Sequence, residues 1–180
     1  MDGKIVLVTG GARSGKSRFA EEYVKKYNAK TAYFATAQIF DEEMRERIQM
    51  HQTQRPKGWT TYETPFNAEI ELKCATESFD AILFDCLTIY TSNLLLSPEM
   101  PEERHLRQQQ ILDKTEKLMK AAKEGQASVI FVTNEVGFGI VPDNPLAREY
   151  RDIAGLVNQK AAAWADEVHL VVCGLPIRIK

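Results

Sequence analysis

The sequence has few cysteines, no long apolar run and no repeated or low-complexity segment. Its 180 residues include only three cysteines, Cys74, Cys86 and Cys173, which are odd in number and show no CxxC spacing. We therefore expect free thiols in a reducing cytoplasm, with Cys86 and Cys173 buried beside apolar runs, and no metal held by cysteine. No apolar stretch approaches about 18 residues, which argues against a membrane-spanning helix.

The chain also lacks a strong charge of either sign. It has 23 basic and 25 acidic residues and a formal net charge of −2, so a general electrostatic affinity for nucleic acid or anionic membranes is not expected. The first predicted strand begins near residue 4, which leaves no room for a signal peptide and favours a cytoplasmic protein. The length fits one domain over residues 1–180, able to bury about 70% of the surface of its unfolded chain.

Short apolar runs alternate with longer helical patterns. This alternation predicts an α/β fold with a mainly parallel central sheet and helices on both faces. A turn at Gly174 precedes a last short strand, which we expect to be antiparallel on the sheet edge, and residues 59–63 are a candidate for another strand. The main predicted strands are 4–9, 31–35, 81–85, 128–133 and 168–173, and the predicted helices are 15–27, 41–54, 86–96, 102–124 and 145–165.

Residues 10–17 form a GxxxxGKS phosphate-binding loop between the first predicted strand and the first predicted helix. Its glycines let backbone N–H groups surround phosphate oxygens, while the following helix directs its positive dipole end at them. Lys16 adds a positive charge and Ser17 adds a hydroxyl for Mg²⁺, so the loop predicts a nucleoside triphosphate site. The loop consists of Gly10, Gly11, Ala12, Arg13, Ser14, Gly15, Lys16 and Ser17.

The second motif is an apolar strand that ends in an acidic residue. Ile82-Leu83-Phe84-Asp85 has the form expected of a strand whose terminal carboxylate holds Mg²⁺ beside Ser17. The alternative is that Asp85 caps the segment that follows. The phosphate-binding loop favours the metal role.

The predicted helix over 41–54 carries a cationic stripe. Arg47, His51 and Arg55 recur at four-residue spacing and therefore share one helix face. Neighbouring like charges repel unless an anion compensates, and a nucleoside triphosphate is such an anion. On spacing alone, a solvated helix face with an incidental histidine is the favoured interpretation.

A third segment lies after the strand near 128–133. Asn134 and Glu135 follow this strand and precede a glycine-containing apolar loop with Phe138. Ligands of open α/β sheets bind at the carboxyl ends of the strands, so this loop shares an edge with the phosphate-binding loop and Asp85. We expect Asn134, Glu135 and Phe138 to face the second substrate.

Taken together, these motifs resemble those of the bifunctional adenosylcobinamide kinase / adenosylcobinamide-phosphate guanylyltransferase family of cobalamin biosynthesis. The similarity extends over nearly the whole chain. Its parts are the segment Val8 to Ser17, Ala35-Thr36-Ala37, Arg47-xxx-His51-xxx-Arg55-Pro56-xx-Trp59, Thr133-Asn134-Glu135-Val136-Gly137 and Arg151-Asp152-xx-Gly155-xx-Asn158-Gln159.

The resemblance implies a RecA-like P-loop NTPase fold, a homotrimer and two Mg²⁺-dependent transferase activities. In the first, the γ-phosphoryl group of ATP or GTP passes to adenosylcobinamide with the help of Lys16. In the second, His51 takes GMP from GTP as a guanylyl-histidine, with Arg47 and Arg55 stabilising the phosphates, and passes it to adenosylcobinamide-phosphate. Further nucleotide contacts implied by the resemblance fall at Ala35, Thr36, Ala37, Gln52, Thr53, Gln54, Glu63 and Asp85.

Two other functions fit parts of the sequence. A single-activity small-molecule or nucleoside kinase needs only the phosphate-binding loop and Asp85, with His51 in a basic lid over the phosphates. A nucleotide-dependent switch or ATPase subunit is a non-enzymatic or hydrolytic alternative. A covalent nucleotidyl adduct distinguishes the bifunctional enzyme from both.

Overall fold

The computed structural model describes residues 3–27, 29–38, 42 and 58–180. Nearly all of the predicted helix over 41–54 therefore lies outside the described residues. The same holds for six predicted site residues, Arg47, His51, Gln52, Thr53, Gln54 and Arg55.

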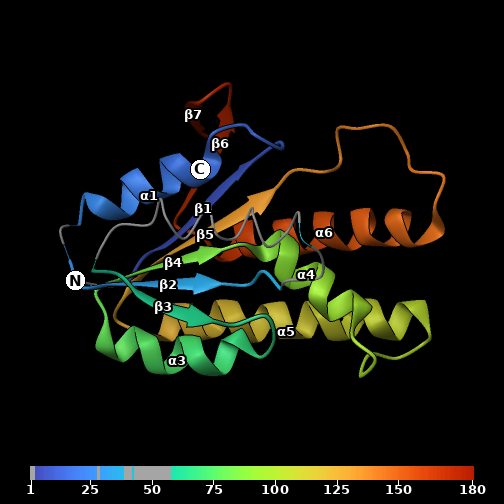
Figure 1. Ribbon diagram of the computed structural model, residues 1–180, viewed down its shortest axis with the longest axis horizontal. Coiled ribbons are helices and arrows are strands. Elements are labelled where there is room, and N and C mark those ends of the chain that lie inside the picture. The colour runs from blue at the N-terminus through green and yellow to red at the C-terminus, as the bar shows by residue number, and fades with distance from the viewer. Residues whose placement is uncertain (1–2, 28, 39–41, 43–57) are drawn as a thin grey trace.

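The described part of the chain forms one seven-stranded sheet in the order β3-β2-β4-β5-β1-β6-β7 (Figure 1). Neighbouring strands are parallel except for β7, which runs antiparallel to β6 at one edge. The predicted mainly parallel sheet, its antiparallel edge strand and the extra strand near 59–63 are thereby confirmed. The strands are β1 (Ile5–Gly10), β2 (Thr31–Ala35), β3 (Thr60–Glu63), β4 (Ala81–Asp85), β5 (Ser128–Asn134), β6 (Glu167–Val172) and β7 (Leu175–Arg178).

Helices cover both faces of this sheet. One face packs against α1, whose Ala20 and Val24 join the cluster around Val6 and Val8. The other face packs against the remaining described helices, as Figure 1 shows. The helices are α1 (Lys16–Lys25), α3 (Ala68–Ser78), α4 (Leu87–Leu96), α5 (Arg104–Glu124) and α6 (Pro145–Trp164).

The sequence of β1 shows why its run is continuously apolar. Ile5 and Leu7 point into the larger cluster, whereas Val6 and Val8 point into the cluster beneath α1. All four side chains are at most 2% exposed. A strand buried on both faces has no need of polar alternation.

Strand register brings four predicted site positions to one edge of the sheet. Gly10 lies opposite Asn134, at the ends of β1 and β5. Ala35 lies opposite Asp85, at the ends of β2 and β4. These are the carboxyl ends of parallel strands, where open α/β sheets bind their ligands.

The three cysteines are free, but only Cys86 is buried. The expectation that Cys173 is buried was wrong. Cys173 lies in the turn between β6 and β7 with φ 51°, and the apolar run beside it ends at this surface turn. Among the helices of the described ranges, none is long and apolar enough to cross a membrane.

Candidate nucleotide site

The phosphate-binding loop connects β1 to α1 and rests on the β6–β7 turn. The backbone N–H of Gly174 donates to the Ser14 carbonyl at 2.8 Å. Gly15 has φ 94°, and a Cβ there would lie 3.0 Å from the Gly174 Cα. A Cβ on Gly10 would lie 2.5 Å from the carbonyl oxygen of Val171. Both glycines are therefore required by close backbone packing as well as by access to phosphate.

Lys16 folds back over this loop. Its side-chain Nζ donates to the Gly11 carbonyl at 3.3 Å, and the residue is 9% exposed. The Ser14 hydroxyl is also buried, and no described residue forms a hydrogen bond with it. A buried ammonium and an unsatisfied hydroxyl within one loop provide donors for phosphate oxygens.

Asp85 ends β4 and is oriented by a buried tyrosine. The Tyr33 hydroxyl donates to Oδ2 of Asp85 at 2.7 Å. The N-cap residue of α4 is Cys86, and no side chain caps that helix. The capping role for Asp85 is therefore wrong, and its carboxylate remains on the ligand-binding edge.

Cys86 directly follows Asp85 and is buried. Burial and the neighbouring Asp85 carboxylate raise the pKa of its thiol to about 11, although Lys16 partly opposes this rise. The thiol stays protonated at neutral pH and is a poor nucleophile or metal ligand.

A buried amide joins the segments that follow β2 and β3. Asn93 of α4 donates from Nδ2 to the carbonyl oxygens of Thr36 at 2.7 Å and Pro65 at 3.1 Å. The Thr36 hydroxyl accepts from the Cys86 N–H at 2.9 Å and donates to the Cys86 carbonyl at 3.0 Å. Thr36 is fully buried, so its side chain builds the site rather than faces a ligand. Asn93 was not predicted as a site residue, because an isolated asparagine inside an apolar helix belongs to no motif.

The exit from β5 is attached to the phosphate-binding loop. The Glu135 N–H donates to the Gly10 carbonyl at 3.1 Å. The Glu135 carboxylate turns back and accepts from the Gly137 N–H at 2.7 Å. The backbone N–H of Asn134 donates a hydrogen bond to the Thr88 hydroxyl at 2.6 Å, which fixes the backbone at this residue.

Beyond Glu135 the connection to α6 exposes large apolar side chains. Phe138, Ile140 and Val141 are 88%, 95% and 62% exposed. In Figure 1 this connection extends past the ends of the strands. Contiguous exposed apolar groups of this kind mark surfaces that bind ligands or other proteins.

Ser17 and Asp85 offer a hydroxyl and a carboxylate, the hard oxygen donors that suit Mg²⁺. Within the described ranges, no group of three or more His, Cys, Asp or Glu side chains forms a metal cluster. Mg²⁺ in nucleotide enzymes is commonly held by one or two protein oxygens together with phosphate oxygens and water. The donor set at this edge fits that arrangement.

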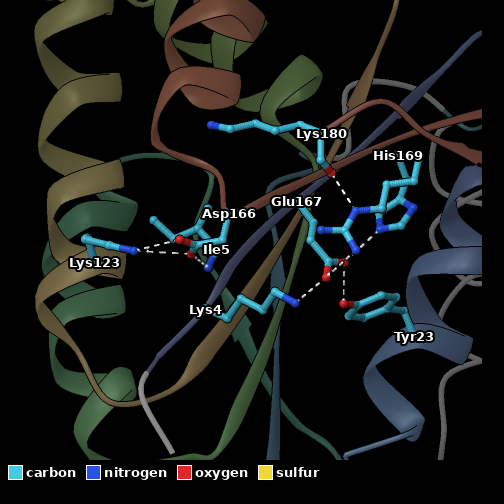
Figure 2. Close-up of polar contacts among 9 residues, drawn as sticks. Lys4, Ile5, Tyr23, Lys123, Asp166, Glu167, His169 and Lys180 are labelled. Carbon is cyan, nitrogen blue, oxygen red and sulfur yellow. Dashed lines mark hydrogen bonds and ion pairs between the residues drawn. The ribbon is translucent and has the colours of Figure 1, made fainter.

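Neither of the two described histidines belongs to the phosphate-binding loop or to a strand end at this edge. His105, in the first turn of α5, is largely exposed, and its Nε2 lies 3.8 Å from a carboxylate oxygen of Glu103. His169 contacts Glu167 at 3.0 Å, and Figure 2 shows Lys4 and Tyr23 around the same carboxylate. Burial alone would raise the pKa of Glu167, but hydrogen bonds from Lys4, His169 and Tyr23 lower it to about 2. Glu167 begins β6, at the opposite end of that strand from the phosphate-binding loop.

Comparison with solved structures supports the fold. A KaiC-like protein, PH0186 from Pyrococcus horikoshii OT3, superposes with a TM-score of 0.52 at 15% identity, over 94% of this chain and 71% of that chain. Together with the sheet topology, this similarity confirms the predicted RecA-like P-loop fold.

Sequence comparison identifies the family. The profile of cobinamide kinase / cobinamide phosphate guanyltransferase (CobU) matches residues 6–179. The bifunctional adenosylcobalamin biosynthesis protein CobU is 45% identical in Salmonella typhimurium and 42% identical in Escherichia coli, in each case over 98% of this chain and 99% of the relative. The bifunctional protein CobP of Pseudomonas aeruginosa is 38% identical over 97% of this chain and 96% of the relative. The chain belongs to the cobinamide kinase / cobinamide phosphate guanyltransferase family.

Proposed function

We propose that this chain is a bifunctional transferase that phosphorylates adenosylcobinamide and then transfers GMP from GTP to the resulting phosphate ester. The observation that carries the proposal is that the phosphate-binding loop, with Lys16, follows β1 and that Asp85 ends β4, both at the carboxyl edge of the parallel sheet. This arrangement occurs in a chain that aligns with bifunctional relatives along nearly its whole length. Both activities belong to the single domain over residues 1–180.

The kinase step uses the phosphate-binding loop. An oxygen of the acceptor hydroxyl attacks the γ-phosphorus of ATP or GTP, the bond from that phosphorus to the bridging oxygen breaks, and the hydroxyl proton is released. Lys16 and the backbone N–H groups of residues 10–17 stabilise the charge on the phosphoryl oxygens. Ser17 and Asp85 hold Mg²⁺, which neutralises phosphate charge when bound.

The guanylyltransferase step uses His51 as the nucleophile. A ring nitrogen attacks the α-phosphorus of GTP, and pyrophosphate leaves as the bond to the bridging oxygen breaks. An oxygen of the acceptor phosphate then attacks the same phosphorus, the P–N bond breaks and the histidine is regenerated. Arg47 and Arg55 stabilise the phosphate charges, and Gln52, Thr53 and Gln54 contact the nucleotide.

The segments that follow β2 and β3 complete the nucleotide site. Ala35, Thr36 and Ala37 contribute backbone surface, because the Thr36 side chain is engaged with Cys86. Glu63 ends β3 opposite Ala35 and provides a carboxylate at the same edge. We place nucleotide contacts at these positions and at Asp85.

The acceptor binds along the β5–α6 connection. Asn134 and Glu135 adjoin the phosphate-binding loop, and Phe138 presents an exposed ring. A corrinoid macrocycle needs a broad apolar surface, which this connection offers. We further propose that the cytoplasmic enzyme assembles as a homotrimer, with a neighbouring subunit contributing to the acceptor surface.

Labelling with GTP that carries radioactive α-phosphate tests the proposal. After incubation with Mg²⁺ and denaturation, the wild-type protein should carry acid-labile, base-stable label, as expected of phosphoramidate, and His51→Ala should carry none. His105→Ala is a matched control, because His105 is an exposed histidine that is not part of the proposed nucleotide site, and it should be labelled like the wild type. Absence of label in the wild type would contradict the guanylyl-histidine intermediate, and a single-activity kinase would remain as the interpretation.

A further inference from the structure

Three side chains of α6 hold the connection that runs from β5 to α6. Each donates to backbone carbonyls of the connection, so the helix fixes the connection at its beginning, near its middle and at its end. The contacts are Asn158 Nδ2 to Asn134 at 3.0 Å, Arg151 Nη2 to Gly137 at 2.5 Å, and Arg148 Nη1 to Pro142 at 2.9 Å and Asp143 at 2.7 Å.

Arg151 differs from Arg148 because part of its hydrogen-bonding capacity is unused. Its Nη1 is buried and has no hydrogen-bond partner among the described residues. In the described part of the chain no carboxylate pairs with Arg151, because the nearby acids have other partners: Asp152 binds Arg104, Glu149 binds Arg107 and Glu135 binds the Gly137 N–H. A carbonyl satisfies one N–H but does not neutralise the cation, so an anion is the ligand that this guanidinium lacks.

Open space adjoins α6 at Gly155. Residues 151, 155 and 158 are spaced i, i+4 and i+7 and therefore share one face of the helix. Among the described residues, no atom lies within 4 Å of the position that a Cβ on Gly155 would occupy. Glycine in a helix interior costs about 1 kcal/mol relative to alanine, and no close packing in the described part of the chain requires it.

The position of Arg151 relative to the phosphate-binding loop narrows the choice of anion. Its carbonyl partner, Gly137, is two residues from Glu135, whose N–H binds Gly10. Two residues of extended chain span at most about 7 Å, so the guanidinium is close to the site of phosphoryl chemistry. Loop residues 10–17 already provide the donors for the nucleotide phosphates. A second anion at this edge therefore belongs to the other substrate.

We infer that Arg151 binds the phosphate group of the phosphorylated acceptor, in the open space beside Gly155. The inference rests on the proposed function, in which the kinase acceptor presents an uncharged hydroxyl and the guanylyltransferase acceptor presents a phosphate monoester. Arg151 therefore distinguishes the two acceptors. A planar guanidinium suits this task, because it binds phosphate oxygens through two parallel hydrogen bonds.

Equilibrium binding of the two acceptors to the full-length protein tests this inference. The dissociation constants of cobinamide and cobinamide phosphate are measured by calorimetry for the wild type, Arg151→Ala and Arg151→Lys. Arg151→Ala should weaken binding of the phosphate ester by about ten- to a hundredfold more than binding of cobinamide. Arg151→Lys should recover part of this difference, because it keeps the charge but loses the planar fork.

Arg148→Ala is the matched control. Arg148 also binds the connection to α6, but unlike Arg151 it has no buried N–H group without a partner in the described part of the chain. This variant should change the two dissociation constants by the same factor. If Arg151→Ala also weakens both ligands equally, Arg151 only shapes the connection and the inference is overturned. If the wild type binds neither cobinamide nor its phosphate, the proposed function itself fails, and that result is distinct from equal weakening.

Gly155→Leu provides a variant that should keep the fold. Leucine is a better helix residue than glycine, so the melting temperature should rise or stay unchanged. Its side chain would occupy the open space beside Gly155 and should weaken binding of cobinamide phosphate more than binding of cobinamide. Unchanged binding of the phosphate ester in this variant would remove this space from the inference.

Discussion

Tyr33 and Asp85 are joined by a hydrogen bond of 2.7 Å between the tyrosine hydroxyl and the carboxylate Oδ2. Tyr33 is 3% exposed, so the bond fixes the carboxylate from the interior of the sheet rather than from solvent. One carboxylate oxygen of Asp85 is thereby engaged, and Asp85 itself lies at the end of β4, on the edge where we place the metal and the phosphates. The role of Tyr33 could not be predicted from the sequence, because Tyr33 is one of several apolar residues in a buried strand.

Tyr33→Phe should lower the rate of phosphoryl transfer by several-fold. The change removes one hydrogen bond to a charged group, a contact that contributes about 1.5–3 kcal/mol to positioning or stability. The kinase kcat and the free energy of unfolding should be measured together, to separate misorientation of Asp85 from loss of stability. Tyr62→Phe is the control, because the Tyr62 ring stacks on Phe34 and its hydroxyl has no hydrogen-bond partner among the described residues. Equal rates for the two variants would contradict an orienting role for Tyr33.

Asn93→Ala should impair the nucleotide site and destabilise the fold. It leaves two buried carbonyls, at Thr36 and Pro65, without their shared donor. Losing two such bonds costs about 2–3 kcal/mol in the free energy of unfolding. The KM for GTP should also rise, because the segments after β2 and β3 are no longer held together.

The isosteric variant Asn93→Asp separates these effects. It keeps the volume of the side chain but replaces the donating amide by an acceptor, so it should be at least as harmful as Asn93→Ala. Urea midpoints and GTP titrations measure the two properties. An Asn93→Asp protein with wild-type KM for GTP would show that the amide does not position the nucleotide segments.

Acid should destabilise the protein through Glu167. Its pKa is lowered to about 2 in the fold, below the ordinary value near 4.5. A carboxyl with a lowered pKa contributes stability that is fully present above its unfolded pKa and is lost as the pH falls from about 4.5 toward 2. A shift of this size corresponds to as much as about 3 kcal/mol.

Glu167→Gln should remove most of this pH dependence. The free energy of unfolding from urea titrations at pH 7 and pH 3 gives the comparison. Glu124→Gln is the control, because Glu124 is exposed and its Lys120 partner lies 3.6 Å away. If the wild type and Glu167→Gln lose the same stability between these pH values, the acid sensitivity comes from other carboxyls.

The fold could be predicted because its strands are buried on both faces. Such strands are uninterrupted apolar runs, and the predicted range 31–35 coincides with β2 while 81–85 coincides with β4. Helix α3 was not predicted, since its buried face consists mainly of small or polar residues such as Ala68, Ala75 and Thr76. The burial of Cys173 was predicted wrongly, because neighbouring apolar residues do not reveal where a strand gives way to a surface turn.

The parts of the site that are short sequence motifs could be predicted. The phosphate-binding loop and Asp85 each follow an apolar strand, and parallel strands bring such positions to one edge. Contacts between distant segments were not predictable, including Tyr33 with Asp85 and Asn93 with Pro65. These pairs depend on tertiary packing, which no short motif encodes.

Gly10→Ala should destabilise the protein much more than Gly11→Ala. A methyl group at Gly10 would lie 2.5 Å from the Val171 carbonyl oxygen and 2.6 Å from the Ser14 hydroxyl, whereas one at Gly11 meets nothing within 4 Å. Both positions are glycines of the same loop, so the pair isolates steric packing from the general entropic effect of glycine replacement. We expect a loss of about 1–3 kcal/mol for Gly10→Ala, the range typical of overpacking, and almost none for Gly11→Ala, measured as the free energy of unfolding in urea. Similar losses for both variants would mean that the loop does not rest on β6 as the Gly10–Val171 contact requires.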